Sequence, residues 1–181
     1  VYVRPMESND FLKITEDMYP DIPKPLLFAM IRFNEEIESQ VNVKRLWGRQ
    51  GSPFEFNLRD IFRWCEAIEH SQMEGDFNIG EFVKLIYADR MRTAEDKNKV
   101  YMIYHHIMSE DRLPPEHFIL HRPLDLNVYE DSVQLGNASI KCAGRNVADT
   151  SMISVPSTQL PVLESIMKCI EMNWMPILVS I

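Results

Sequence analysis

Two arginines four residues apart, Arg59 and Arg63, are the side chains of this sequence best placed to do chemistry. They follow Asn57, a residue that favours helix N-caps, so both are predicted to lie on one face of a helix. In the first turn, the positive end of the helix dipole disfavours Arg59 by about 0.3–1 kcal/mol. A residue that violates a local preference can be a functional one. The alternative is a solvated arginine without a partner.

Other reactive residues give weaker patterns. His117 and His121 have the spacing of zinc ligands on a helix, but Phe118 stands where a metalloprotease has glutamate. Three prolines between residues 114 and 123 also disfavour a regular helix there. No serine or cysteine has the sequence context of a nucleophile. We therefore expect neither a metal site nor a catalytic residue within this chain.

A basic loop is predicted between residues 40 and 53, with Lys44, Arg45 and Arg49 around Trp47. Cations interleaved with an aromatic ring can bind nucleic acid or phosphate. Alternatively, the tryptophan packs on a neighbouring helix and the charges stay in water. The net charge of −8 favours this second interpretation, so we do not expect direct nucleic-acid binding.

The helix that carries Arg59 is predicted from its cap and its apolar spacing. Asp60, three residues after Asn57, places a carboxylate near the unpaired amides of the first turn. Behind this cap, apolar residues recur at intervals of three and four, which is typical of one buried helix face. This stripe contains Leu58, Ile61, Phe62, Cys65 and Ile68.

Four further helices are predicted before residue 110: one that is capped by Ser8 or Asn9 and ends at about residue 18, and three over about 26–38, 79 to about 92, and 94–109. Their starts are expected at Ser8 or Asn9, after Pro23 and Pro25, at Asn78 and at Thr93. Thr93 and Asp96 come close to a capping box. The side chains predicted to be buried are Leu26, Leu27, Met30, Ile31, Ile79, Phe82, Val83, Ile86, Met91, Val100, Ile103, Tyr104 and Ile107.

Beyond a proline-containing linker at 110–125, the periodicity changes. Residues 133–135 and 138–142 flank Gly136-Asn137 and predict a β-hairpin. A helix capped by Thr158 should direct Leu160, Leu163, Met167 and Ile170 inward. Residues 174–181 form a continuous apolar run that favours a strand covered on both faces. The predicted fold class is mainly α: a helical bundle followed by a small α/β segment of hairpin, helix and strand.

Composition sets further bounds. The 181 residues are 45% hydrophobic and 25% charged, as in ordinary globular proteins. Three cysteines, far apart and odd in number, favour reduced thiols in an intracellular, reducing compartment. No apolar run has membrane-spanning length, so no membrane partner is expected. The start in an apparent strand and the apolar end suggest a segment of a larger protein.

The stretch FNLRDIFRWCE at 56–66 resembles the sensor 2 helix in the lid of AAA+ modules of the midasin family, dynein-related ATPases of ribosome assembly. Residues 157–179 resemble the helix and first strand that lead into the next module's Walker A loop. In the family a phosphate loop follows, whereas Ser180-Ile181 stands here. Neither a Walker A nor a Walker B motif is found in the sequence, so we expect no ATP hydrolysis by this chain alone.

The resemblance implies a division into four parts: an end strand of a large AAA+ subdomain (1–6), a helical lid (7–109), a linker with the hairpin (110–156), and the start of the next module (157–181). It also implies that Arg59, the first arginine of the helix, reaches the ATP phosphates. A positioned guanidinium would stabilise the charge that phosphoryl transfer builds there. Arg63 is the secondary candidate, for structure or a subunit contact.

For a longer parent protein, the resemblance implies ATP and Mg²⁺ as cofactors. It implies chaperone-like remodelling of pre-ribosomal large-subunit particles in the nucleolus and nucleoplasm of the nucleus. The expected partners are neighbouring AAA+ modules, the particle and its assembly factors, with the lid coupling the ATP cycle to motion between modules. One alternative is a stand-alone helical interaction module without a nucleotide role. Another is the lid of a dynein-like or MoxR-like AAA+ protein.

Overall fold

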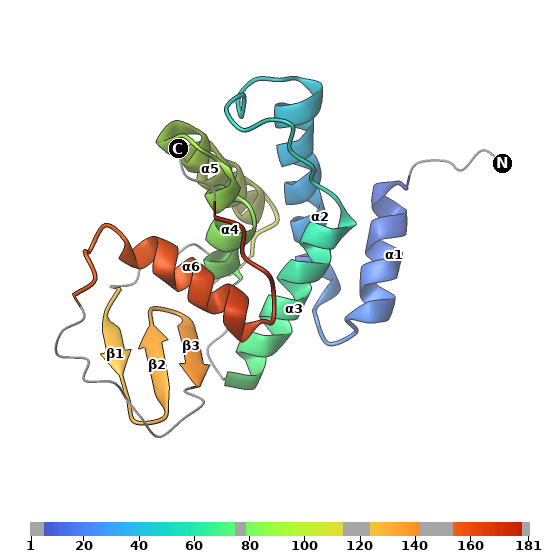
Figure 1. Ribbon diagram of the computed structural model, residues 1–181. Helices are drawn as coiled ribbons and strands as arrows, with labels where there is room; N and C mark the ends of the chain where they lie inside the picture. Colours follow the sequence, from blue (N-terminus) through green and yellow to red (C-terminus); the bar gives the residue numbers. More distant parts are fainter. Residues whose placement is uncertain (1–5, 75–78, 114–123, 142–153, 179–181) are drawn as a thin grey trace. The chain divides into compact units, whose positions relative to one another are not determined.

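The computed structural model describes residues 6–74, 79–113, 124–141 and 154–178, which belong to two compact units, Val1–Leu120 and His121–Ile181 (Figure 1). The first unit is helical in its described part, and the second combines a small sheet with one helix. This confirms the predicted fold class. The elements of the first unit are α1 (Ser8–Met18), α2 (Lys24–Glu38), the π-helical turn η1 (Ser39–Val43), α3 (Leu58–Glu74), α4 (Gly80–Ile86), the 3₁₀ turn η2 (Ala88–Arg90) and α5 (Ala94–Glu110).

Four aromatic rings form the centre of the helical unit. Phe33 of α2, Trp64 of α3, Tyr87 between α4 and η2, and Tyr104 of α5 are all fully buried. Phe33 meets the other three edge-on, with ring centroids 4.9 Å from Tyr87 and 5.6 Å from Trp64 and Tyr104. Edge-to-face pairs add about 0.5–1.5 kcal/mol each to the burial of their area. This cluster therefore fixes α3, which carries Arg59, against α2 and α5.

Two predicted helix starts are confirmed by hydrogen bonds. Asn57 Oδ1 accepts from the backbone N–H of Arg59 at 3.0 Å, and Thr93 Oγ1 accepts from that of Asp96 at 3.0 Å. The start of α1 was predicted wrongly: its N-cap is Glu7, whose N–H donates to Asp10 at 3.0 Å. The N3 carboxylate of Asp10 thus favours Glu7 as the N-cap, because it accepts the Glu7 backbone N–H.

For the remaining helices, the buried side chains were predicted more accurately than the first and last residues. α2 begins two residues before the predicted 26 and is extended at its end by η1. The predicted helix from 79 to about 92 is instead two pieces, α4 and η2, and its predicted cap, Asn78, lies outside the described residues. Of the side chains predicted to be buried in the four helices besides α3, all but the half-buried Ile103 are buried. In the apolar stripe of α3, Ile61, Cys65 and Ile68 are buried, whereas Leu58 and Phe62 are half-buried.

The second unit contains an antiparallel sheet of β1 (Leu126–Val128), β2 (Ser132–Leu135) and β3 (Ala138–Lys141), with α6 (Leu160–Glu171) packed on β2 and β3 (Figure 1). The hairpin is confirmed, since Leu135 pairs with Ala138 and leaves Gly136-Asn137 as a two-residue turn. β1 was not predicted. Leu135, Ala138 and Met167 form the core, with Leu124, Val133, Ile140, Leu160 and Leu163 packed around them.

Three predictions for the second unit were wrong. The N-cap of α6 is Gln159, not Thr158, and Ile170 is 49% exposed rather than turned inward. Residues 174–178 have no strand structure, although the Trp174 N–H donates to the Cys169 carbonyl at 2.7 Å. An apolar run forms a strand only beside other strands, and no described strand pairs with it. The division of the hairpin and α6 between a linker and a following module stays a prediction.

Candidate functional site

The candidate site is the first turn of α3 and the extended segment 54–57 that leads into it. Arg59 lies on this turn and its side chain is exposed, as is that of Arg63 one turn later. In the described parts of the chain, neither guanidinium has an ion-pair partner. Arg59 contributes to the fold through its backbone N–H, which donates to Asn57. Its charge is therefore available to an external anion.

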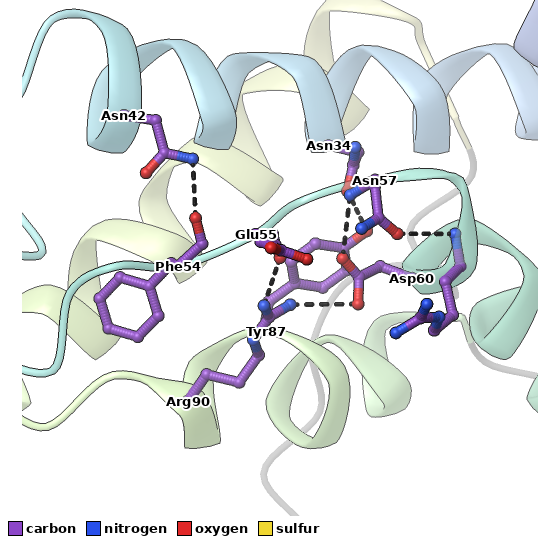
Figure 2. A network of polar contacts seen from close by, with 9 residues as sticks. Asn34, Asn42, Phe54, Glu55, Asn57, Asp60, Tyr87 and Arg90 are labelled. Atoms are coloured by element: carbon purple, nitrogen blue, oxygen red, sulfur yellow. Dashed lines mark hydrogen bonds and ion pairs between the residues drawn. The ribbon is translucent and has the colours of Figure 1, made fainter.

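Unlike Arg59, its neighbour Asp60 is nearly buried and has an ion-pair partner. Its side chain is 7% exposed, and Oδ1 lies 3.1 Å from Arg90 Nη1. Its other oxygen accepts from the backbone N–H of Asn57 at 3.1 Å, which closes the capping pair at this helix start. Figure 2 shows Arg90 also donating to the backbone carbonyl of Glu55. Arg90 thus joins the entry segment to the helix turn.

The entry segment is held by a hydrogen bond from η1 and by aromatic packing of Phe56. Phe56 contacts both Arg90, whose guanidinium carbon is 4.7 Å from the ring centroid, and Tyr87, whose ring is nearly parallel with its centroid 6.3 Å away. Tyr87 donates its hydroxyl to Asn34 Oδ1 at 3.0 Å, and Asn42 Nδ2 donates to the Phe54 carbonyl at 3.0 Å (Figure 2). These contacts fix the backbone that carries Arg59.

Burial keeps the groups beneath the site in their neutral forms. It raises the pKa of Tyr87 well above the ordinary value, with a smaller contribution from the charge of Asp60. Burial likewise raises the pKa of the Cys65 thiol to about 12, assisted by Glu69 and Glu66. Neither group can act as a nucleophile or base near neutral pH. The chemistry that this site can perform is binding or stabilising an anion with the Arg59 guanidinium.

The other sequence candidates do not join this site. His117 and His121 lie outside the described residues. Within 6–74, 79–113, 124–141 and 154–178, no three His, Cys, Asp or Glu side chains are close enough together to hold a metal ion. In the same ranges, no helix has the length and apolar character to cross a membrane.

The structure of the basic loop agrees with the interpretation in which Trp47 packs inward and the cations stay in water. Trp47 is 5% exposed and donates its indole N–H to Gln40 Oε1 at 2.8 Å. Lys44, Arg45 and Arg49 are exposed. The ring is therefore packed into the helical unit while the charges remain in water.

Sequence reasoning missed Arg90. Its partner Asp60 is 30 residues away, and Asp60 already had a local explanation as an N-terminal carboxylate of α3. No local pattern connects η2 with α3. The only available signal was a cation close to the end of an apolar stretch, and Arg92, two residues later, offered the same signal.

Comparison with known proteins gives one consistent family. The family model of the midasin AAA lid domain matches residues 10–111. Midasin of Dictyostelium discoideum is 32% identical over 197 aligned residues, which cover 99% of this chain. Midasin of Giardia intestinalis is 26% identical over 148 residues, or 77% of the chain. The chain spans about 3% of the length of each of these curated relatives. By the lid match and this similarity, the chain belongs to the midasin family, and its residues 10–111 form a midasin AAA lid domain.

Proposed function

We propose that the helical unit closes over the nucleotide of a midasin-type AAA+ module, with Arg59 as its sensor 2 contact to the ATP phosphates. The observation that carries this proposal is the exposed guanidinium of Arg59 on a backbone fixed by Asn57, Asp60 and Arg90. A rigid turn with an uncommitted cation suits an anion that arrives from another subdomain. Membership of the midasin lid family supports the same assignment.

The proposed chemistry is electrostatic. In phosphoryl transfer, negative charge spreads over the equatorial phosphoryl oxygens, and Mg²⁺ and cationic side chains stabilise it. The Walker A and Walker B residues of a large subdomain would hold ATP and Mg²⁺, while Arg59 would add one positioned donor from the lid. Arg63, one turn on, would instead serve structure or a contact with a neighbouring subunit or module.

For a longer protein that contains this lid, we propose ATP-driven, chaperone-like remodelling of pre-ribosomal large-subunit particles in the nucleolus and nucleoplasm. Lid closure would transmit the nucleotide state to neighbouring AAA+ modules as a rigid-body rotation. The particle and its assembly factors would be the partners. Family membership is the support for this wider proposal.

The test is a structure of a longer chain that joins this lid to its large subdomain, prepared with Mg²⁺ and a non-hydrolysable ATP analogue. The proposal predicts the Arg59 guanidinium within hydrogen-bonding distance of a phosphate oxygen, with the Asp60–Arg90 pair unchanged. A nucleotide bound in the large subdomain while Arg59 faces solvent would contradict the sensor role. It would favour the alternative of a helical interaction module.

A further inference from the structure

The loop that follows η1 exposes two apolar side chains to water beside three cations. Val43 is 74% exposed and Leu46 63% exposed, and the two enclose the exposed Lys44 and Arg45. Arg49 follows and is also exposed. We refer to residues 43–49 as the Val43–Arg49 loop. From Ser39 to Phe54 the sequence has three cations and no carboxylate, although the chain as a whole has a net charge of −8.

The shape of this loop is fixed by hydrogen bonds to the backbone of η1. The backbone N–H of Lys44 donates to the Ser39 carbonyl at 2.8 Å, within the π-helical turn, and that of Leu46 donates to the Gln40 carbonyl at 2.9 Å. π-Helical turns are rare and frequently lie at functional sites. Arg45 adopts φ 52°, a left-handed conformation that is uncommon for a residue with a side chain.

The far end of the loop is equally constrained. Gly48 has φ +73°, and a Cβ placed on it would lie 3.0 Å from a methyl carbon of Val41. Its backbone N–H donates to Asp96 Oδ1 at 3.3 Å, in the first turn of α5. Trp47 is packed inward and bound to Gln40. The loop therefore cannot turn Val43 and Leu46 inward without breaking these contacts.

We propose that the Val43–Arg49 loop is a docking surface for an acidic protein segment that also carries apolar side chains. Charge complementarity selects the acidic character, because Lys44, Arg45 and Arg49 have no ion-pair partner among the described residues. The pair Val43 and Leu46 selects the apolar character, since covering them removes exposed apolar area from water. This surface and its partner are independent of the nucleotide role of Arg59.

A single-stranded nucleic acid fits the loop less well. Such ligands need exposed aromatic rings on which bases stack, in addition to cations. Trp47, the aromatic ring within this loop, is 5% exposed and its N–H is already bound. The exposed Val43 and Leu46 have no counterpart on a phosphate backbone. The observations therefore favour a protein segment.

The test measures fluorescence anisotropy of labelled probes with the whole 181-residue chain. One peptide mixes Asp and Glu with Leu and Phe, and a second has Ser and Gly in place of the apolar residues. We expect the first peptide to bind about tenfold more tightly than the second, and more weakly as salt rises. The double variant Lys44→Glu, Arg49→Glu should lose about tenfold in affinity, as should Val43→Ser, Leu46→Ser.

Matched controls are Lys13→Glu, an exposed cation of α1, and Met102→Ser, an apolar residue of α5 that is 70% exposed. Both should leave affinity within about twofold, and circular dichroism should show all variants folded. Equal binding of the two peptides, or no binding of the first, would overturn the proposal. So would tighter binding of an oligouridylate RNA that the charge-reversing variant abolishes, because the loop would then be a nucleic-acid interface.

Discussion

The guanidinium of Arg90 lies 3.1 Å from the carboxylate of Asp60, and the two residues, 30 apart in sequence, join η2 to the first turn of α3. The pair neutralises Asp60 beside Arg59 and leaves the Arg59 charge uncommitted. The adjacent residues Arg59 and Asp60 therefore differ in their contacts. Asp60 fixes the backbone, and Arg59 projects from it.

Replacing Arg90 should destabilise the helical unit. Arg90→Ala leaves the nearly buried Asp60 carboxylate with its Asn57 partner alone and uncovers Phe56, so we expect a loss of about 1–3 kcal/mol in the free energy of unfolding. Urea denaturation followed by circular dichroism measures this. Arg63→Ala, at an exposed site, should change it by less than about 0.5 kcal/mol. Equal effects of the two variants would show that the Arg90–Asp60 pair contributes nothing.

The hairpin turn should not tolerate a side chain at Gly136. Its φ is +56°, and an added Cβ would lie 2.3 Å from Glu164 Oε1 and 2.9 Å from Leu124 Cδ2. Gly136→Ala should therefore destabilise the second unit by more than about 1 kcal/mol, measured by hydrogen exchange at Leu135 and Ala138.

The double variant Gly136→Ala, Glu164→Ala separates the two causes. It removes the collision with the carboxylate but keeps the left-handed strain, and it loses the hydrogen bond from the Asn137 N–H to Glu164, 3.1 Å long. We expect a non-additive result, with the double variant less destabilised than the sum of the single variants. Simple additivity would mean that the Glu164 side chain moves aside freely.

Stability should fall at alkaline pH partly through Cys65. Burial raises its pKa from 9.0 to about 12, so between these values the thiol ionises in the unfolded chain but not in the folded one. The Cys65 contribution is fully present below pH 9 and is lost as pH rises to 12, by up to about 1.4 kcal/mol per pH unit. Urea denaturation between pH 8 and 11 should show a shallower fall for Cys65→Ala than for the parent chain. Identical slopes would contradict the assignment.

The chain alone should not bind ATP tightly. Its sequence contains no Gly-x-x-x-x-Gly-Lys-Ser/Thr loop, so the backbone amides and lysine that cradle phosphates elsewhere are missing from it. One exposed arginine does not replace them. Isothermal titration with Mg-ATP should show no micromolar binding, whereas micromolar affinity would reveal a phosphate site that the sequence did not predict.

Much of the fold followed from local chemistry. Asn57 and Thr93 were predicted as caps because a side-chain oxygen there meets unpaired amides, and both do so. Gly136-Asn137 was predicted as a tight turn because the pair separates two strand-like runs, and Gly136 adopts φ 56° there. Such signals act within four residues, so the sequence displays them directly.

Long-range pairing could not be predicted in this way. Trp64 is not part of the predicted apolar stripe, yet it is fully buried against Phe33, and its N–H donates to the Ile79 carbonyl, 15 residues away, at 3.1 Å. The apolar run 174–181 was predicted as a strand, and its described part, 174–178, has no strand structure, because apolar composition does not supply a neighbouring strand. For the site, Arg59 was identified from the sequence, while Arg90, which holds its turn, was not.

The most direct test of the nucleotide role compares ATP turnover of Arg59→Ala and Arg63→Ala in a longer chain whose module containing this lid hydrolyses ATP. Loss of one donor that stabilises transition-state charge should cost Arg59→Ala about 2–4 kcal/mol, roughly a 30- to 1,000-fold lower kcat. Lid folding should be intact, because the arginine is exposed. Arg63→Ala should lower turnover far less. The account is contradicted if Arg59→Ala unfolds the lid, or if it leaves turnover unchanged while Arg63→Ala abolishes it.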